Sequence, residues 1–182
     1  SMLGILFGSG LGVELDAARS TELFETACDL GEPRGCANLA IVLISAPGDP
    51  QDVRRGVGLF ERACADDLAL ACFSLGELYF TGEAVPKDLS LSAELYGHAC
   101  GLDHGEACHN AGLLTEMGHP EASGPTDARK FFSRACALEI PRGCVALGLI
   151  YDEGRGVKTD KPKGVSLYEK ACDLGSGNGC YN

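Results

Sequence analysis

Ten cysteines are the residues of this chain best suited to form covalent cross-links or to bind a metal ion. They form two series, at positions 28, 64, 100, 136 and 172 and at positions 36, 72, 108, 144 and 180, and each series advances by 36 residues. Each cysteine of the first series is followed eight positions later by one of the second. A constant period of this length is typical of an array of repeated structural units. The cysteine geometry must therefore recur five times.

The spacing within each pair predicts a disulfide across a chain reversal. On one continuous helix the two residues would lie about 12 Å apart, because the rise is roughly 1.5 Å per residue. A disulfide holds its Cα atoms about 4.4 to 6.8 Å apart, so the chain must turn between the cysteines. Residues 29–35 contain two glycines and a proline, which is typical of a turn. The predicted bridges are Cys28–Cys36, Cys64–Cys72, Cys100–Cys108, Cys136–Cys144 and Cys172–Cys180. The alternative is that the cysteines remain reduced and serve as small buried hydrophobic residues.

These bridges indicate an oxidising compartment and leave no cysteine for redox chemistry. Closing a loop of this size contributes about 2.5 kcal/mol of stability by the chain-entropy estimate. A framework with so many bridges indicates a secreted or periplasmic protein. A catalytic thiol would have to be unpaired or strained, and ten evenly paired cysteines leave none spare.

Apolar residues at helical spacing predict two helices per repeat. One helix ends at the first cysteine, as in residues 88–100 and 160–172, and the other begins just before the second cysteine, as in residues 72–80. Two short helices cannot bury a core alone, so neighbouring repeats must stack. We therefore predict an all-α fold, an α/α superhelix of five 36-residue helix pairs with a concave face and one disulfide per repeat.

A small residue precedes each cysteine of a pair, and an aspartate precedes most of the helices that end at a first cysteine. Alanine precedes each first cysteine, and glycine or alanine precedes each second cysteine, which predicts a close approach of the two backbones. The aspartates stand at equivalent positions, where a carboxylate can cap a helix N-terminus. The predicted caps are Asp16, Asp52, Asp88 and Asp160. In the fourth repeat this position is Gly124, and the cap falls to Thr126 or Asp127.

Composition and charge narrow the class of protein. The chain has 182 residues, 45% of them hydrophobic, with 26 acidic against 15 basic side chains and a net charge of -11. Because no basic stripe is present, we expect no nucleic-acid partner. No apolar stretch reaches the roughly 20 residues of a membrane span. We treat 3–182 as one domain, in the register 3–38, 39–74, 75–110, 111–146 and 147–182. Ser1-Met2 is interpreted as a cloning remnant, and the array is expected to be part of a longer one.

Catalytic or metal chemistry finds little support among the remaining residues. Serine-based hydrolysis of a β-lactam needs a Ser-x-x-Lys motif, which is absent, and Ser176-Gly177-Asn178 is interpreted as a turn. Four histidines lie near one another in the sequence, at His98, His104, His109 and His119. They could meet around the bridge Cys100–Cys108, but bridged cysteines cannot bind a metal ion. We interpret the histidines as ordinary solvent-exposed residues, and predict no catalytic residue, metal or cofactor.

The predicted concave face supplies the candidate binding residues. Positions two, five and nine after each second cysteine form one stripe along a helix. The residues predicted to contact a ligand are Asn38, Ser74, Glu77, Thr81, Asn110, Leu113, Met117 and Glu153, and the same stripe includes Ile41, Ser45, Ala146 and Leu149. Asparagine can hydrogen-bond an extended backbone, while the glutamates and the net charge of -11 favour a basic partner. The alternative is that these residues are merely solvated.

The motif run Leu147-Gly-Leu-Ile-Tyr151-Asp-Glu-Gly154-Arg-Gly156-Val157, followed by Ala171-Cys172-Asp173-Leu174-Gly175, resembles the Sel1-like repeat. The paired cysteines resemble the cysteine-rich branch typified by the Helicobacter cysteine-rich proteins. The resemblance implies a right-handed superhelix, similar to tetratricopeptide (TPR) arrays, with a groove for peptides or extended protein segments. The function predicted first is therefore that of a protein- or peptide-binding scaffold outside the reducing cytoplasm. The family also suggests two alternatives: a β-lactam-binding protein or β-lactamase, and a redox-linked assembly factor of the mitochondrial intermembrane space.

Overall fold

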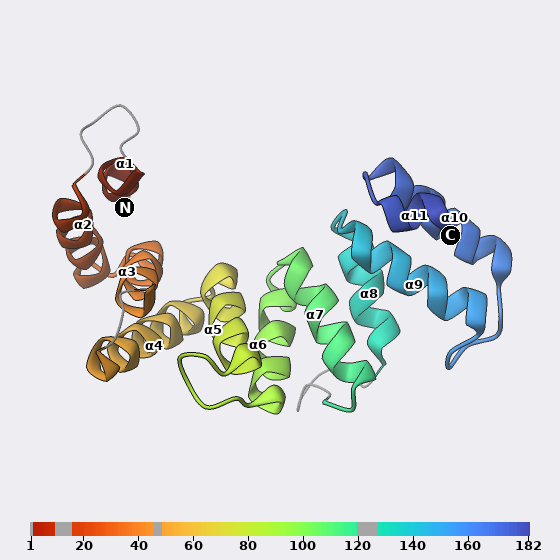
Figure 1. Ribbon diagram of the computed structural model, residues 1–182, viewed down its shortest axis with the longest axis horizontal. Coiled ribbons are helices and arrows are strands. Elements are labelled where there is room, and N and C mark those ends of the chain that lie inside the picture. The colour runs from red at the N-terminus through yellow and green to blue at the C-terminus, as the bar shows by residue number, and fades with distance from the viewer. Residues whose placement is uncertain (1, 10–15, 46–48, 120–126) are drawn as a thin grey trace. The chain divides into compact units, whose positions relative to one another are not determined.

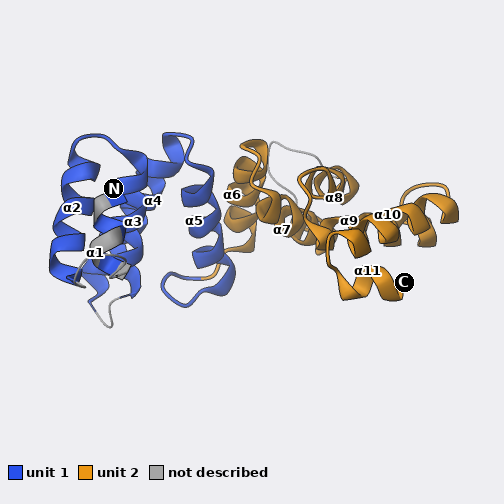
Figure 2. Ribbon diagram, turned by 90° about the horizontal axis from the view of Figure 1, so that it is seen from above, with its two compact units in different colours: residues 1–86 blue, residues 87–182 orange. Residues whose placement is uncertain are grey.

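The computed structural model describes residues 2–9, 16–45, 49–119 and 127–182 (Figure 1). All regular secondary structure in these ranges is helical. The helices are α1 (Met2–Ser9), α2 (Ala17–Asp29), α3 (Pro33–Ser45), α4 (Pro50–Ala65), α5 (Ala69–Thr81), α6 (Leu89–Gly101), α7 (Gly105–Glu116), α8 (Ala128–Ala137), α9 (Pro141–Glu153), α10 (Lys161–Asp173) and α11 (Gly177–Tyr181). They belong to two compact units, Ser1–Pro86 and Lys87–Asn182 (Figure 2). Among the described residues, no helix is both long and apolar enough to cross a membrane.

Within each unit, consecutive helices pack against one another, which confirms the predicted all-α helix-pair solenoid. In the first unit α2 packs on α1 and α3, and α4 packs on α3 and α5. In the second unit α7 packs on α6 and α8, and α10 packs on α9 and α11. The division of the chain into one domain and its exact register remain predictions.

All five predicted disulfides are present, and none of the ten cysteines is free. Their Cα atoms lie 4.5 to 4.7 Å apart, so the alternative of reduced cysteines is wrong for this structure. The close approach that the small residues predict is also confirmed. A Cβ added to Gly143 would lie 2.5 Å from the Cβ of Ala135 and 3.0 Å from the backbone nitrogen of Cys136.

Side-chain carboxylates cap the helices that contain the first cysteine of each pair. Asp16 accepts from the backbone N–H of Arg19, Asp88 from those of Ser90 and Leu91, and Asp160 from that of Lys163. In the fourth repeat the cap is Asp127, and Gly124 and Thr126 lie outside the described residues.

The prediction for the second repeat is wrong, because the cap of α4 is Asp49 and Asp52 lies in the first turn of the helix. Asp49 accepts from the backbone N–H of Gln51 at 2.7 Å. The helix begins one turn early because Pro50 occupies its first position, where the fixed φ of proline suits a helix start.

A recurring contact between an aromatic ring and a glycine holds the helix pairs together. Phe132 of α8 lies against Gly112 of α7, and Tyr168 of α10 lies against Gly148 of α9. In both pairs an added Cβ would come within 2.5 Å of the ring, so only glycine fits with the ring in this position. Phe132 also packs with Leu147 and Ile150 in the core of the second unit.

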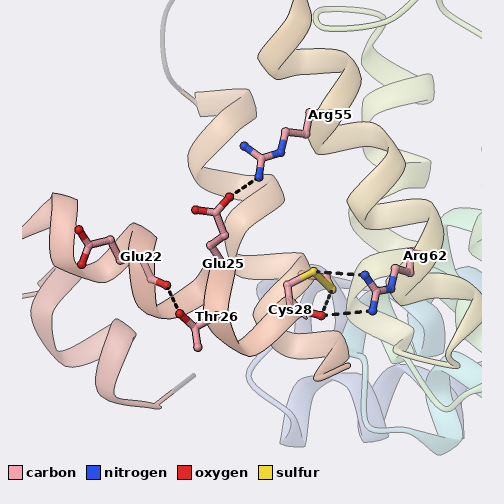
Figure 3. A network of polar contacts seen from close by, with 7 residues as sticks. Glu22, Glu25, Thr26, Cys28, Arg55 and Arg62 are labelled. Atoms are coloured by element: carbon pink, nitrogen blue, oxygen red, sulfur yellow. Dashed lines mark hydrogen bonds and ion pairs between the residues drawn. A yellow bond between two sulfur atoms is a disulfide. The ribbon is translucent and has the colours of Figure 1, made fainter. Parts of the chain in front are cut away.

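Basic side chains join consecutive repeats at a second recurring position. Arg62 donates to the carbonyl oxygen of Cys28 at 3.2 Å (Figure 3), and Lys170 donates to that of Cys136 at 2.9 Å. Arg134, at the same place in its repeat, donates to the carbonyl oxygen of Gly101 at 3.4 Å. Each cation therefore meets the C-terminal end of a preceding helix, where the negative end of the helix dipole favours positive charge.

Candidate protein-binding face

In the first unit, the residues predicted to contact a ligand on α3 and α5 lie together. We define the α3–α5 face as Asn38, Ile41, Ser45, Ser74 and Glu77, which line two neighbouring hollows of the surface. Three of them come from α3 and two from α5. The structure thus brings together side chains that the sequence places on two separate repeats.

The first hollow has a volume of about 230 Å³ and lies between α3 and α5. Its lining residues are Ile41, Ile44 and Ser45 of α3, Phe60 of α4, and Phe73, Ser74, Glu77 and Leu78 of α5. Ile41 is 45% exposed although it is a large apolar residue. Apolar surface, two hydroxyl groups and one carboxylate therefore line the same hollow.

The second hollow has a volume of about 310 Å³ and is lined by residues of α1, α3 and the start of α5. Asn38 lines it together with Met2 and Ile5 of α1 and with Leu70 of α5. Met2 is 78% exposed. The large apolar side chains that line the second hollow are thus open to solvent.

Sequence reasoning missed Met2 and Ile5 as candidates, although both lie one period of 36 residues before the stripe positions Asn38 and Ile41. Continuing the register backwards past the first cysteine would have found them. The interpretation of Met2 as a cloning remnant remains untested, but the structure places this residue in α1 beside the hollow.

Thr81 is the predicted site residue of the first unit that does not line these two hollows. It is the last residue of α5, is exposed, and donates its hydroxyl hydrogen to the carbonyl oxygen of Leu78 at 3.4 Å. Its role in binding remains a prediction.

The predicted residues of the second unit lie in α7, directly after it and in α9. Leu113 and Met117 are four residues apart and exposed, Met117 to 62%, while Asn110 is half-buried. Glu153 ends α9 and forms an ion pair with Arg155 at 3.0 Å. Because Arg155 offsets its charge, Glu153 attracts a basic partner less strongly than its position in the sequence suggests.

Among the described residues, no three of the four histidines lie close enough together to share a metal ion. His104 caps α7, where its Nδ1 accepts from the backbone N–H of Ala107 at 3.2 Å. His109 is only 7% exposed and packs against the ring of Phe132, so it is a core residue and the interpretation of it as solvent-exposed is wrong. Burial lowers the pKa of both side chains.

Ser176, the other residue considered for chemistry, has a structural role. Its hydroxyl accepts from the backbone N–H of Gly179 at 3.2 Å and caps α11. This agrees with its interpretation as part of a turn between helices.

The repeat geometry agrees with a comparison with known protein families. The model of the Sel1 repeat matches the chain five times, at residues 1–32, 33–68, 69–104, 105–139 and 141–176. The chain belongs to the Sel1 repeat family. The family model begins its repeats earlier in the sequence than the register predicted above. Among curated proteins none matches this Sel1 repeat chain.

Two of the solved structures that are similar to this chain share its fold. A Sel1 repeat protein from Oxalobacter formigenes is 24% identical, with a TM-score of 0.79 over 98% of this chain and 73% of its own. A protective antigen of uropathogenic Escherichia coli is 21% identical, with a TM-score of 0.81 over 98% of this chain and 38% of its own. Helicobacter pylori cysteine rich protein B is 25% identical, over 96% of this chain and 98% of its own, with a TM-score of 0.33. These Sel1 repeat chains differ in length, and this one spans well under half of the E. coli antigen.

Proposed function

We propose that this Sel1 repeat chain is a protein-interaction scaffold that binds a peptide or an extended segment of a partner protein on the α3–α5 face. The observation that carries the proposal is the convergence of stripe residues from two repeats on the hollow between α3 and α5. The family supports it, because Sel1 repeats belong to the helical-repeat architectures whose extended surfaces serve in binding.

The chemistry of the face defines the kind of partner. An apolar side chain of the ligand can enter the hollow beside Ile41 and Phe73, where it displaces water from exposed apolar surface. Asn38 and Ser74 offer hydrogen bonds to a peptide backbone. Glu77 and the net charge of -11 favour a ligand that carries lysine or arginine.

The disulfides support a site of action outside the reducing cytoplasm, because bridges of this kind persist in oxidising compartments. We propose a secreted or periplasmic protein, with the mitochondrial intermembrane space as the alternative. The β-lactamase and redox alternatives gain no support, since Ser176 serves as a helix cap and no cysteine is free.

The proposal can be tested with a random peptide-display library screened against the oxidised chain. Peptides enriched by the wild-type protein are then measured against Ser74→Arg, which places a long cation in the first hollow. Ser133→Arg on α8 is the matched control, because Ser133 is exposed and lies in the other unit.

We expect Ser74→Arg to weaken binding about ten-fold or more, equivalent to at least about 1.4 kcal/mol. Ser133→Arg should leave the affinity unchanged. Enriched peptides that bind both variants equally well, or a screen that enriches no peptide at all, would contradict the proposal.

A further inference from the structure

A third hollow of the first unit lies away from the α3–α5 face. It has a volume of about 580 Å³ and is formed by α4 and the turn that follows α5. The apolar lining residues are Pro50, Val53 and Val57 of α4 and Ala84, Val85 and Pro86 of the turn. None of the residues of the α3–α5 face lines it. A volume of this size is sufficient for a drug-sized ligand or for one or two side chains of a peptide.

Gly58 explains why α4 carries a hollow here. A Cβ added to Gly58 would meet no atom within 4 Å, so packing does not require a glycine at this position. The equivalent exposed residues of the other repeats all have side chains: Glu22, Glu94, Lys130 and Ser166. Glycine in a helix interior is unfavourable for stability. Its presence where nothing approaches therefore favours a role at the surface, where it leaves space for a bound group.

Neighbouring Gly56 shows the contrast. A Cβ there would lie 2.6 Å from Cγ1 of Ile44 and 3.1 Å from the carbonyl oxygen of Ala40. Gly56 thus permits the close contact of α4 with α3, whereas Gly58 on the exposed side has no such function.

The charged residues around the hollow select the ligand. Asp49, Glu61 and Glu83 contribute three carboxylates, and Arg54 contributes one guanidinium group. The local charge is therefore negative, as is the charge of the whole chain. An apolar floor with a predominantly acidic rim complements a ligand that has an apolar side chain between basic ones.

We infer that the hollow between α4 and residues 83–86 is a second peptide-binding site, which takes an apolar residue flanked by lysine or arginine. Val53, Val57 and Val85 contact the apolar side chain, and Glu61 and Glu83 attract the flanking cations. This site is independent of the proposed function, since it uses none of the residues of the α3–α5 face.

The test is a titration of the oxidised, ¹⁵N-labelled chain, followed by NMR. The probe is the capped peptide Lys-Lys-Phe-Lys-Lys, compared with Lys-Lys-Ala-Lys-Lys and Glu-Glu-Phe-Glu-Glu. We expect the probe to shift the backbone amide signals of Val57, Gly58 and Ala84, and to bind about ten-fold or more tightly than either comparison peptide.

Three variants make the test specific. Gly58→Phe places an aromatic ring at the hollow, from a position where an added Cβ meets no atom within 4 Å, and should weaken binding of the probe about ten-fold or more. Ser166→Phe places the same side chain at the equivalent exposed position of α10 and should have no effect. Ser74→Arg, which blocks the α3–α5 face, should also have no effect.

Three results would overturn the inference: equal binding of the phenylalanine and alanine peptides, undiminished binding to Gly58→Phe, or no shift of the three amide signals up to millimolar probe. Loss of binding to Ser74→Arg alone would overturn it as well, because it would assign the probe to the α3–α5 face.

Discussion

Two alanine substitutions on the same helix measure how tightly α3 and α4 pack. Gly56 and Gly58 are two residues apart in α4 and differ in their surroundings. A new methyl group at Gly56 would lie 2.6 Å from Cγ1 of Ile44 and 3.1 Å from the carbonyl oxygen of Ala40, whereas at Gly58 it would meet nothing within 4 Å. Ile44 can rotate away, but the backbone of Ala40 cannot.

The magnitudes follow from two opposing effects. Alanine is better than glycine in a helix interior by about 1 kcal/mol, and this gain is common to both variants. We therefore expect Gly58→Ala to raise the free energy of unfolding by about 0.5 to 1 kcal/mol. At Gly56 the gain is opposed by overpacking of about 1 to 3 kcal/mol, so the variant should be less stable than Gly58→Ala by that amount.

Urea unfolding followed by far-UV circular dichroism, with the disulfides intact, measures both free energies. The comparison holds if the free energy of unfolding falls with urea concentration at the same slope in both variants. In thermal unfolding the difference corresponds to about 2 to 4 °C per kcal/mol for a chain of this size. If Gly56→Ala proved as stable as Gly58→Ala, the close contact of α3 with α4 would be refuted.

Two further predictions concern the second unit. Replacing both Cys136 and Cys144 by alanine should lower the free energy of unfolding by about 2.5 kcal/mol, and an unchanged urea midpoint would contradict this estimate. Burial, reinforced by the charge of Arg142 and opposed by that of Glu106, lowers the pKa of His109. The unfolded chain therefore binds the proton more readily, so stability should be full above the ordinary pKa and fall as the pH drops through about 6.5. Between about pH 7.5 and about pH 5.5, His109→Leu should lose less free energy of unfolding than the wild-type chain, as measured by urea unfolding. An equal loss in both proteins would exclude His109 as the source of the pH dependence.

The repeating features of the fold could be predicted from the sequence because they are imposed by covalent or steric constraints. A pair such as Cys136 and Cys144 can form a bridge only if the chain reverses between them. The small residue Gly143 then identifies the point where the two helices approach, and the structure confirms both.

The features that vary between repeats were harder to predict. Asp52 was expected to cap its helix because the aspartates of other repeats do so, but Pro50 starts α4 earlier and Asp49 caps it. The third hollow depends on how residues 83–86 lie against α4, which is a matter of side-chain volume and turn conformation. A periodic pattern cannot predict a site that exists because one repeat departs from the pattern.

The division between constant and variable positions also explains how such a fold can acquire binding specificity. Residues that recur with the period, such as Cys144, Phe132 and Ala135, are buried, and changing them disturbs packing at an interior density that tolerates few voids. Exposed positions such as Ile41 and Gly58 support little of the core, so most changes there cost little stability. Binding sites can therefore differ from one helix pair to the next while the disulfides and the contacts between rings and glycines keep each pair in place. By this reasoning, the departures from the repeat, more than the repeat itself, locate the two binding surfaces that we propose.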